Sequence, residues 1–477
     1  MCEMNSFFTR RTLYTLFSVL VVVLGTLVAI RYAKGGFHFT NTGLQTESGL
    51  LAANSFPSGA QVFVDDRLVT ATDDTLYLEP GSYNVRIAKD GYSSWQKQVS
   101  LEKELVVQTN AQLFPVAPSL TNLTFTGLEN LSPSPDGQKL LYYTASNSAQ
   151  KKNGLYILEL VDNPLSIQKG ARQIAEDSST FDLAHANFIW SPDSSQVLII
   201  AANRQVLISI DKNNDLNALP DSTFQQRQIL SEWEQEIYLR ERQFLAQFPE
   251  EVVAMATVSA KNVYISPDKK RLLYTAIAQA TLPDTIVPPV PATSSQPEER
   301  SIQPGGIYVY DREEDKNFRI GTENPLQPVA PSPSPSPTAG TKVSPKTANL
   351  IAPPVLFQSK MLLNYDLATA SMPATAAATQ FRNLQASTPA QTALNFNVYY
   401  TSLYVNTFQW FPDSRHLLSV TDNRVQVREY DGTNATTLYS GPFDKTFLYP
   451  WPDGSRVIIT TTFSPETPHN LYAIELK

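Results

Sequence analysis

The residues that most often carry chemistry are few in this chain and form no recognisable site. The four histidines, His38, His185, His416 and His469, are scattered without H-x-x-x-H or H-E-x-x-H spacing, so a zinc site is not expected. The sequence has no G-x-S-x-G nucleophile elbow, no Walker motif and no G-x-G-x-x-G phosphate-binding loop. We therefore predict no catalytic residues, no metal ligands and no cofactor.

Five aspartates recur in one short pattern that explains them without catalysis. Proline presets the first corner of a type I turn, and the aspartate that follows accepts hydrogen bonds from nearby backbone N–H groups. Apolar residues lie five positions before each aspartate and four and five positions after it, as expected for strand–turn–strand. The predicted turns are Pro135-Asp136, Pro192-Asp193, Pro267-Asp268, Pro412-Asp413 and Pro452-Asp453. His416 follows one of them and is predicted to lie on the surface.

A repeated strand–turn–strand unit is typical of a radially repeated sheet, so we predict an all-β protein. Five motifs favour five blades, and a sixth without the motif could lie within residues 350–405. The chain stops after the third strand of the last blade, so its fourth strand is expected near Pro118–Thr124, which would close the ring and remove two open edges. Third strands are expected at Leu155–Leu160, Val206–Asp211, Ile307–Asp311, Val425–Tyr430 and Leu471–Leu476.

The turns resemble those of the TolB-like, WD40-like propeller repeats, whose blades carry a W-S-P-D-G turn. The resemblance covers residues 113–477 and implies a β-propeller, but its motif is structural and implies no activity. The matching segments are Trp190-Ser191-Pro192-Asp193, Trp410-Phe411-Pro412-Asp413, Trp451-Pro452-Asp453-Gly454 and Ser134-Pro135-Asp136-Gly137.

Three segments interrupt the blade rhythm of the predicted propeller. Residues 222–248 predict an amphipathic helix, with a capping box at Ser222 and Gln225, and residues 277–304 and 322–360 are Pro-rich and predict disordered loops. Strand direction places all three at the face opposite the Pro-Asp turns. The apolar stripe of the helix is either a partner-binding surface or a cap on the propeller; its residues are Leu230, Trp233, Ile237, Phe244 and Phe248.

An uncharged run near the N-terminus predicts a membrane segment. Leu13 to Ile30 contains no charged residue, and at about 1.5 Å per residue such a helix nearly matches a hydrocarbon core of about 30 Å. We predict an uncleaved signal anchor and a single-pass protein of the cell membrane. The expected boundaries are 1–11 for a cytoplasmic tail, 12–31 for the transmembrane helix and 32–48 for a tether.

The orientation of this anchor follows from its flanks. Arg10, Arg11 and the terminal amine precede the run, whereas Arg31 and Lys34 follow it, so the positive-inside rule slightly favours a cytoplasmic N-terminus and extracytoplasmic C-terminal domains. The single cysteine, Cys2, excludes an intrachain disulfide.

Residues 49–112 change to short alternating strands separated by Pro/Gly and Asp/Gly turns. This segment resembles the PEGA domain family, which implies a small β-sandwich common in envelope-associated prokaryotic proteins and carries no catalytic residues. Tyr83, Tyr92 and Trp95 are interpreted as core packing. Asp73 departs from the family, where a proline usually follows the threonine. The matching residues are Ser55, Pro57, Gly59, Ala60, Val62-Phe63-Val64-Asp65, Thr72, Pro80-Gly81, Tyr83, Val85, Gly91-Tyr92 and Trp95.

The charge balance limits the partners. A net charge of −8 argues against nucleic acid, which needs a basic stripe, and the one run of three basic residues, Lys269-Lys270-Arg271, is interpreted as a solvated turn. The leading hypothesis is a non-enzymatic, membrane-anchored envelope protein whose propeller binds a protein or a cell-wall polymer. The alternatives are a cytoplasm-facing scaffold or sensor and a glycan-active enzyme using propeller carboxylates.

Overall fold

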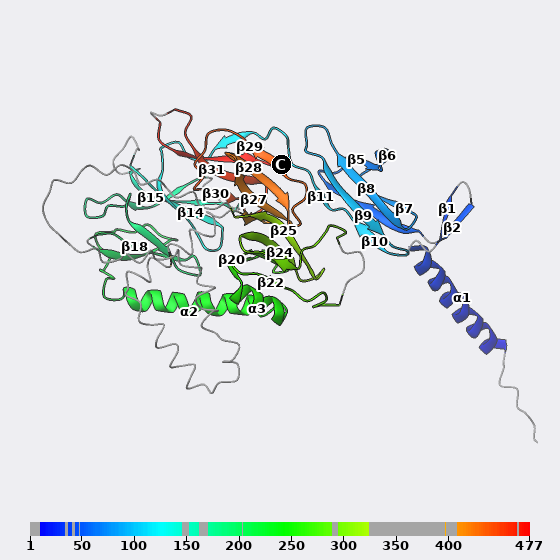
Figure 1. Ribbon diagram of the computed structural model, residues 1–477. Helices are drawn as coiled ribbons and strands as arrows, with labels where there is room; N and C mark the ends of the chain where they lie inside the picture. The colour runs from blue at the N-terminus through cyan, green and yellow to red at the C-terminus, as the bar shows by residue number, and fades with distance from the viewer. Residues whose placement is uncertain are drawn as a thin grey trace, which may run out of the picture. The chain divides into compact units, whose positions relative to one another are not determined.

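The computed structural model describes most of the chain (Figure 1). The longest stretch outside the described residues is 324–407, apart from Phe396. Two compact units are present, Met1–Val116 with Pro289–Pro297, and Ala117–Pro288 with Glu298–Lys477. The described residues are 10–33, 37–40, 43–46, 48–145, 152–161, 170–202, 204–288, 294–323, 396, 408–464 and 467–477.

The chain begins with a long apolar helix, α1 (Arg10–Ala33). Its segment Tyr14–Arg31 has a mean hydropathy of 2.0, and none of it is buried within the protein, so by length and composition it could cross a membrane or serve as a signal sequence. The predicted tether that follows is not wholly irregular, because β1 (Phe37–Thr40) and β2 (Gly43–Thr46) form an antiparallel hairpin.

The rest of the first unit is a small β-sandwich. Two main sheets have the strand orders β10-β3-β7 and β6-β5-β8-β9, and a shared core includes Leu51, Val62, Ile87 and Trp95. A short parallel pair, β4 (Ser55–Phe56) with β11 (Ala111–Gln112), completes it. The main strands are β3 (Gly49–Ala53), β5 (Gln61–Val64), β6 (Arg67–Ala71), β7 (Asp74–Leu78), β8 (Gly81–Ala88), β9 (Trp95–Leu101) and β10 (Val106–Gln108).

The aromatic residues of this domain pack as expected, and its C-terminal boundary shifts. Trp95 is buried, and Tyr83 and Tyr92 are half-buried against the same core. The prediction ended the domain at residue 112, but Leu113 is part of the core and its N–H donates to the Phe56 carbonyl at 2.8 Å. The compact unit therefore extends to Val116.

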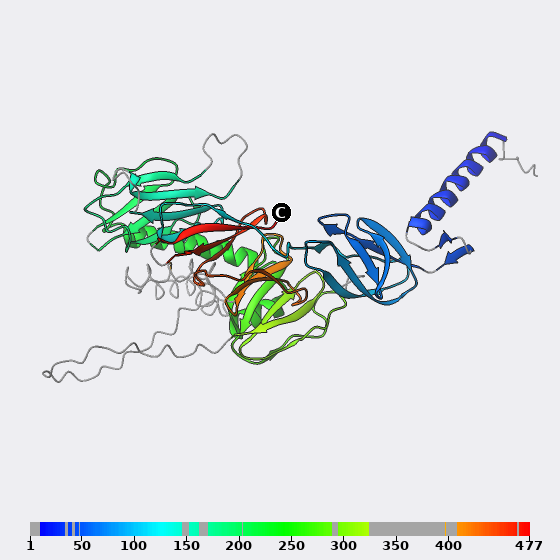
Figure 2. The ribbon, with the colours of Figure 1, turned by 90° about the horizontal axis from the view of Figure 1, so that it is seen from above.

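Among the described residues, the second unit contains five antiparallel sheets of three or four strands, which are drawn in Figures 1 and 2. Each of these sheets carries one Pro-Asp turn between its first and second strands. We number them as blades in chain order. Blade 1 is β13 (Glu129–Pro133), β14 (Lys139–Thr144), β15 (Gly154–Glu159) and β16 (Arg172–Glu176). Blade 2 is β17 (Asn187–Trp190), β18 (Gln196–Ile200) and β19 (Gln205–Ser209).

The later blades follow the same plan, and the five predicted third strands match β15, β19, β24, β28 and β32 within one or two residues at each end. Blade 3 is β20 (Ala260–Ile265), β21 (Arg271–Ala276), β24 (Gly306–Asp311) and β25 (Lys316–Thr322). Blade 4 is β26 (Phe408–Trp410), β27 (His416–Thr421), β28 (Arg424–Glu429) and β29 (Thr436–Tyr439). Blade 5 is β30 (Leu448–Pro450), β31 (Arg456–Thr461), β32 (Asn470–Glu475) and the early strand β12 (Leu120–Asn122).

Strand β12 closes the ring, as the sequence predicted. It pairs antiparallel with β32, with Thr121 opposite Ala473, and the Leu123 N–H donates to the Leu471 carbonyl at 2.9 Å. The Thr124 hydroxyl adds a bond to the Asn470 side chain at 3.0 Å. The start and the end of the domain therefore share one sheet, in which β32 is an inner strand and β12 is the edge strand, so the predicted removal of both open edges holds only for β32.

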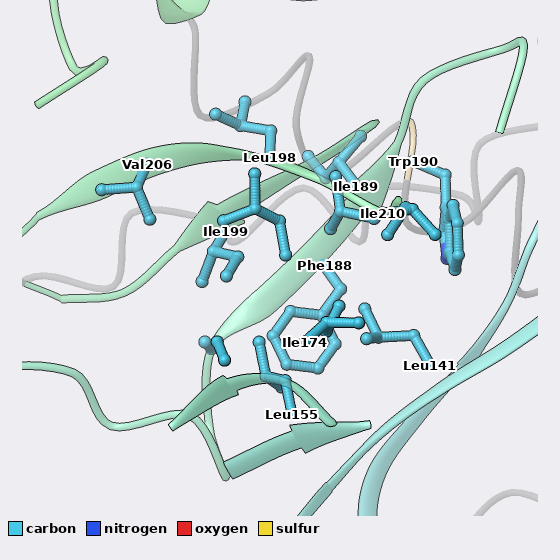
Figure 3. Close-up of a cluster of buried hydrophobic side chains, with 14 of the residues drawn as sticks. Leu141, Leu155, Ile174, Phe188, Ile189, Trp190, Leu198, Ile199, Val206 and Ile210 are labelled. Atoms are coloured by element: carbon cyan, nitrogen blue, oxygen red, sulfur yellow. The ribbon is translucent and has the colours of Figure 1, made fainter. Parts of the chain in front are cut away.

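Apolar side chains join neighbouring blades. In Figure 3, Leu141, Leu155 and Ile174 of blade 1 face Phe188 and other side chains of blade 2. These side chains are almost fully buried. Burial of this kind is the main favourable term in holding such sheets together.

The helical insertion is larger than predicted. It consists of α2 (Gln226–Leu245) and a second helix, α3 (Glu250–Val258), because Pro249 ends the first helix yet suits the start of the next. The predicted capping box is wrong: Gln225 occupies the N-cap without a side-chain cap bond.

The predicted disordered loop at 277–304 is wrong where the structure describes it. β22 (Ala280–Thr281) and β23 (Ser301–Ile302) pair antiparallel, and the apolar residues Leu282 and Ile302 anchor the segment in the core of blade 3. The predicted loop at 322–360 lies outside the described residues from residue 324 onward. So does the possible sixth blade at 350–405, apart from Phe396.

Candidate functional site

The five Pro-Asp turns have the same backbone geometry. Each is a turn whose fourth residue adopts a left-handed conformation and donates its N–H to the carbonyl three residues back, at 2.8–3.0 Å. This is the type I turn with a following left-handed residue that hairpins often use. The left-handed residues, with φ between 60° and 75°, are Gly137, Ser194, Lys269, Ser414 and Gly454.

The repeated carboxylates are bound within their own turns. Each accepts a hydrogen bond at Oδ1 from the N–H two residues further on, at 2.8–3.1 Å. The donors are Gln138, Ser195, Lys270, Arg415 and Ser455. The hydroxyl of Ser191 donates to Asp193 at 2.5 Å and, as the largest cause, lowers the pKa of that carboxyl. A carboxylate held ionised in this way is a poor general acid.

The turns also make contacts from one blade to the next. The Ser194 hydroxyl of blade 2 accepts from the Asp136 N–H of blade 1 at 3.1 Å, and the Ser414 hydroxyl of blade 4 accepts from the Asp268 N–H of blade 3 at 2.9 Å. In blades 1 and 5 the left-handed turn residue is glycine, and an aromatic residue of the preceding blade lies close to it. A Cβ at Gly137 would lie 3.1 Å from the Tyr449 hydroxyl.

The tryptophans of the turn motif bridge the same pairs of blades. The Trp190 indole N–H donates to the Ser132 hydroxyl at 3.0 Å, and the Trp410 indole N–H donates to the Tyr264 carbonyl at 3.2 Å. The turn motif therefore joins blades as well as bending each one.

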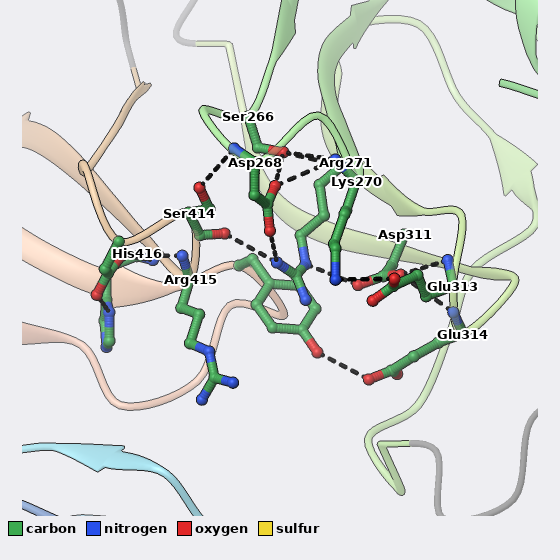
Figure 4. Close-up of polar contacts among 12 residues, drawn as sticks. Ser266, Asp268, Lys270, Arg271, Asp311, Glu313, Glu314, Ser414, Arg415 and His416 are labelled. Atoms are coloured by element: carbon green, nitrogen blue, oxygen red, sulfur yellow. Dashed lines mark hydrogen bonds and ion pairs between the residues drawn. The ribbon is translucent and has the colours of Figure 1, made fainter. Parts of the chain in front are cut away.

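A polar cluster lies between blades 3 and 4 and centres on Arg271 (Figure 4). Its guanidinium Nε lies 2.6 Å from Oδ2 of Asp311, which is fully buried. The same guanidinium lies 4.0 Å above the Tyr430 ring and donates to the Ser414 carbonyl at 3.0 Å. The interpretation of Lys269-Lys270-Arg271 as a solvated turn is thus wrong for Arg271, which is nearly buried.

The cluster is closed by further carboxylates. The Tyr430 hydroxyl donates to Glu314 at 3.0 Å, and burial raises the pKa of Tyr430 well above its usual value. Asp311 Oδ1 accepts from the N–H groups of Glu313 and Glu314 at 2.8 and 3.0 Å. Each group named here has a partner inside the protein, so the cluster joins two blades and presents no free nucleophile or base.

His416 also corrects a prediction. It is 3% exposed instead of lying on the surface, and its Nδ1 lies 2.6 Å from Oδ2 of Asp413. Its ring meets Phe411 edge to face. Burial opposes ionisation of Asp413, but the charge of His416 and its hydrogen bonds lower the pKa of Asp413 overall. The histidine therefore belongs to the packing of the blade 4 turn.

The stripe of α2 faces the propeller. Leu230, Trp233 and Ile237 are buried in the core of blades 1 and 2, and Phe248 is buried with blade 3. Phe244 is half-buried. A partner-binding role for the stripe as it stands is wrong, and the helix is a cap on the propeller, because these side chains are already covered.

The helix also extends beyond its predicted face: it begins beside Gln205, at the end of blade 2 opposite the Pro-Asp turn. Arg240 of α2 donates to the carbonyl of Pro192, in the turn of blade 2, at 3.2 Å. The helix therefore reaches the turn face, because its 20 residues span roughly 30 Å at about 1.5 Å each. Among the described residues, no group of three or more His, Cys, Asp or Glu side chains could hold a metal ion.

Sequence reasoning missed Asp311, which ends β24 of blade 3, and Tyr430, which directly follows β28 of blade 4. A charged or hydroxyl-bearing residue at the end of an apolar strand was the feature of the sequence that could have pointed to them.

Comparison with known families bears on the first domain. The PEGA domain model matches residues 48–116. These residues form a PEGA domain. The match ends where the compact unit ends, at Val116. No curated protein matches the chain.

Solved structures similar to the chain include propellers. Putative TolB from Agrobacterium tumefaciens shares 11% identity over 74% of this chain and 82% of its own, with a TM-score of 0.20. TolB from Acinetobacter baumannii shares 11% over 82% of this chain and 59% of its own, with a TM-score of 0.19. Oligogalacturonate lyase from Vibrio parahaemolyticus shares 8% over 83% and 86%, with a TM-score of 0.23. At these TM-scores the likeness carries no argument, and the propeller fold rests on the sheets, turns and ring closure described above.

Proposed function

We propose that this chain is a non-enzymatic, membrane-anchored protein of the cell envelope whose propeller binds a protein or a cell-wall polymer. The observation that carries the proposal is α1, whose segment Tyr14–Arg31 is apolar and entirely uncovered by the rest of the chain. Exposing such a segment to water is costly, whereas a bilayer matches its length.

The domain that follows supports an envelope location. Residues 48–116 match the PEGA domain, a family that the sequence resemblance associates with envelope proteins of prokaryotes. The flanking charges favour a cytoplasmic N-terminus, and we propose that the PEGA domain and the propeller lie on the other side of the membrane.

The propeller's polar groups support binding over catalysis. The Pro-Asp carboxylates are used by their own turns, and the Arg271 cluster is satisfied between blades. Blades that carry loops at both ends suit recognition, because binding residues commonly lie on loops positioned by a scaffold.

Photo-crosslinking in intact cells tests this function. A photoreactive amino acid at Phe224, which is 98% exposed, or at Phe125, which is 76% exposed, should yield irradiation-dependent adducts with an envelope protein or a wall polymer. Unirradiated cells are the control. Adducts only with cytoplasmic proteins would favour the inverted scaffold, and cleavage of a wall polymer or glycan by the purified full chain would overturn the non-enzymatic role.

A further inference from the structure

Among the described residues, the junction between blades 2 and 3 lacks the tryptophan and serine contacts that join blades 1 and 2 and blades 3 and 4. Where Trp190 and Trp410 bridge to the blade before them, blade 3 has Ile265, which has no side-chain donor. Its left-handed turn residue, Lys269, does not repeat the serine contact either. Instead its ammonium lies 4.2 Å from the ring centroid of Phe244 in α2.

Helix α2 occupies this junction. Arg240 and Phe244 are four residues apart and therefore lie on one side of the helix, yet they reach different blades: Arg240 donates to Pro192 of blade 2, and Phe244 lies under Lys269 of blade 3. Just beyond the helix, Arg312 of blade 3 donates to the Gln247 carbonyl at 3.1 Å.

The apolar packing divides in the same way. The first half of α2 belongs to the core of blades 1 and 2 through Leu230, Trp233 and Ile237. Leu245 at its end and Val252 of α3 belong to the core of blade 3. None of the described core clusters joins blade 2 to blade 3 without the helices. In contrast, blades 3 and 4 share a core, and so do blades 5 and 1.

We infer that α2–α3 is a wedge that closes the ring between blades 2 and 3, and that the ring opens at this seam before it opens between blades 3 and 4. The described contacts of the wedge with the turns include the side-chain hydrogen bond of Arg240 and the cation–π contact of the exposed Lys269, and such contacts are weak at a surface. The seam between blades 3 and 4 instead has the nearly buried Arg271 guanidinium of blade 3, which donates to the Ser414 carbonyl of blade 4, and the Asp268 N–H, which donates to the Ser414 hydroxyl. Local opening is expected where packed contacts between elements are fewest.

Hydrogen exchange of the full chain in detergent tests the inference. In the native protein, amides of α2 and α3 should exchange at least tenfold faster than those of β31 in blade 5. The double variant Arg240→Ala/Lys269→Ala removes only the two turn contacts of the wedge, and it should speed exchange in α2, α3 and β20 by a further several-fold while leaving β31 unchanged.

The matched control is Arg415→Ala, which removes an exposed basic residue from the turn of blade 4, away from the wedge. This variant should leave the exchange rates of the α2 and α3 amides unchanged. Native α2 and α3 protected as strongly as β31 would overturn the inference, as would a double variant that loosens blade 5 equally or loosens nothing. If the double variant does not fold, the ranking in the native chain decides.

Discussion

Removing the Arg271 side chain should cost the propeller more stability than removal of any surface charge. Arg271→Met keeps most of the aliphatic volume but leaves Asp311, which is 0% exposed, without its cation. Breaking one side of a buried ion pair typically costs about 3–5 kcal/mol. Because Asp311 retains two backbone N–H donors, we expect the lower end, about 3 kcal/mol, or roughly a 150-fold change in the unfolding equilibrium.

Asp311→Asn shows how much of the loss comes from the unpaired charge of Asp311 and how much from lost packing around Arg271. Asp311→Asn removes the charge but keeps an oxygen that can accept the N–H groups of Glu313 and Glu314. The double variant Arg271→Met/Asp311→Asn should therefore recover at least half of the loss.

Urea unfolding of the full chain in detergent, followed by tryptophan fluorescence, measures these differences. Trp410 is a suitable reporter because it bridges the same two blades. Arg415→Ala, on the exposed side of the neighbouring turn, is the control and should change stability by less than about 0.5 kcal/mol. A cost below about 1 kcal/mol for Arg271→Met, or a double variant worse than the sum of its singles, would refute the reasoning.

Three further predictions concern the turns, the ring closure and α2. The pKa of Asp193 is lowered on folding, so its carboxylate contributes fully to folding stability above about pH 4, and this contribution is lost as pH falls through the pKa of the folded state. Asp193→Asn should therefore reduce the loss of stability between about pH 4 and lower pH, measured by urea unfolding at a series of pH values. An unchanged loss of stability in acid would contradict this. Leu123→Pro removes the N–H that bonds to the Leu471 carbonyl and should lower the free energy of unfolding in urea by about 1–3 kcal/mol. Leu123→Ala is the control, because it retains this bond. Equal losses of unfolding free energy in the two variants would count against ring closure through this bond. Phe396 is 0% exposed and packs on α2, so Phe396→Ala should lower the free energy of unfolding by about 3–5 kcal/mol in the same assay. A loss below about 0.5 kcal/mol, as is usual for a surface residue, would show that the contact is dispensable.

Much of the fold could be predicted because its signals are local. Proline and aspartate determine a turn through their own backbone preferences, so the turns and their flanking strands follow from short segments of sequence. The closing strand β12 follows instead from the strand count, because the last blade has only three strands of its own. Trp95 could likewise be assigned to the core from the sequence, because apolar and polar residues alternate along its strand.

The seams between blades could not be predicted in this way, because they depend on residues far apart in sequence. Arg271 is part of a basic run that resembles a solvated turn, and only the fold places it against Asp311 and Tyr430. His416 looks exposed beside its own turn but is covered by Phe411 and Asp413. The stripe of α2 gave the correct apolar face, yet periodicity cannot tell whether that face meets a partner or the protein's own blades.

Cysteine labelling in intact cells tests most directly the claim that an anchored propeller faces outward. The native Cys2 precedes α1, and Phe224→Cys in a Cys2→Ser background places a thiol at a 98% exposed propeller position. The account predicts that a membrane-impermeant maleimide labels the Phe224→Cys chain in intact cells and labels Cys2 of the native chain only after permeabilisation. Labelling of Cys2 in intact cells, with Phe224→Cys protected until the membrane is opened, would contradict it.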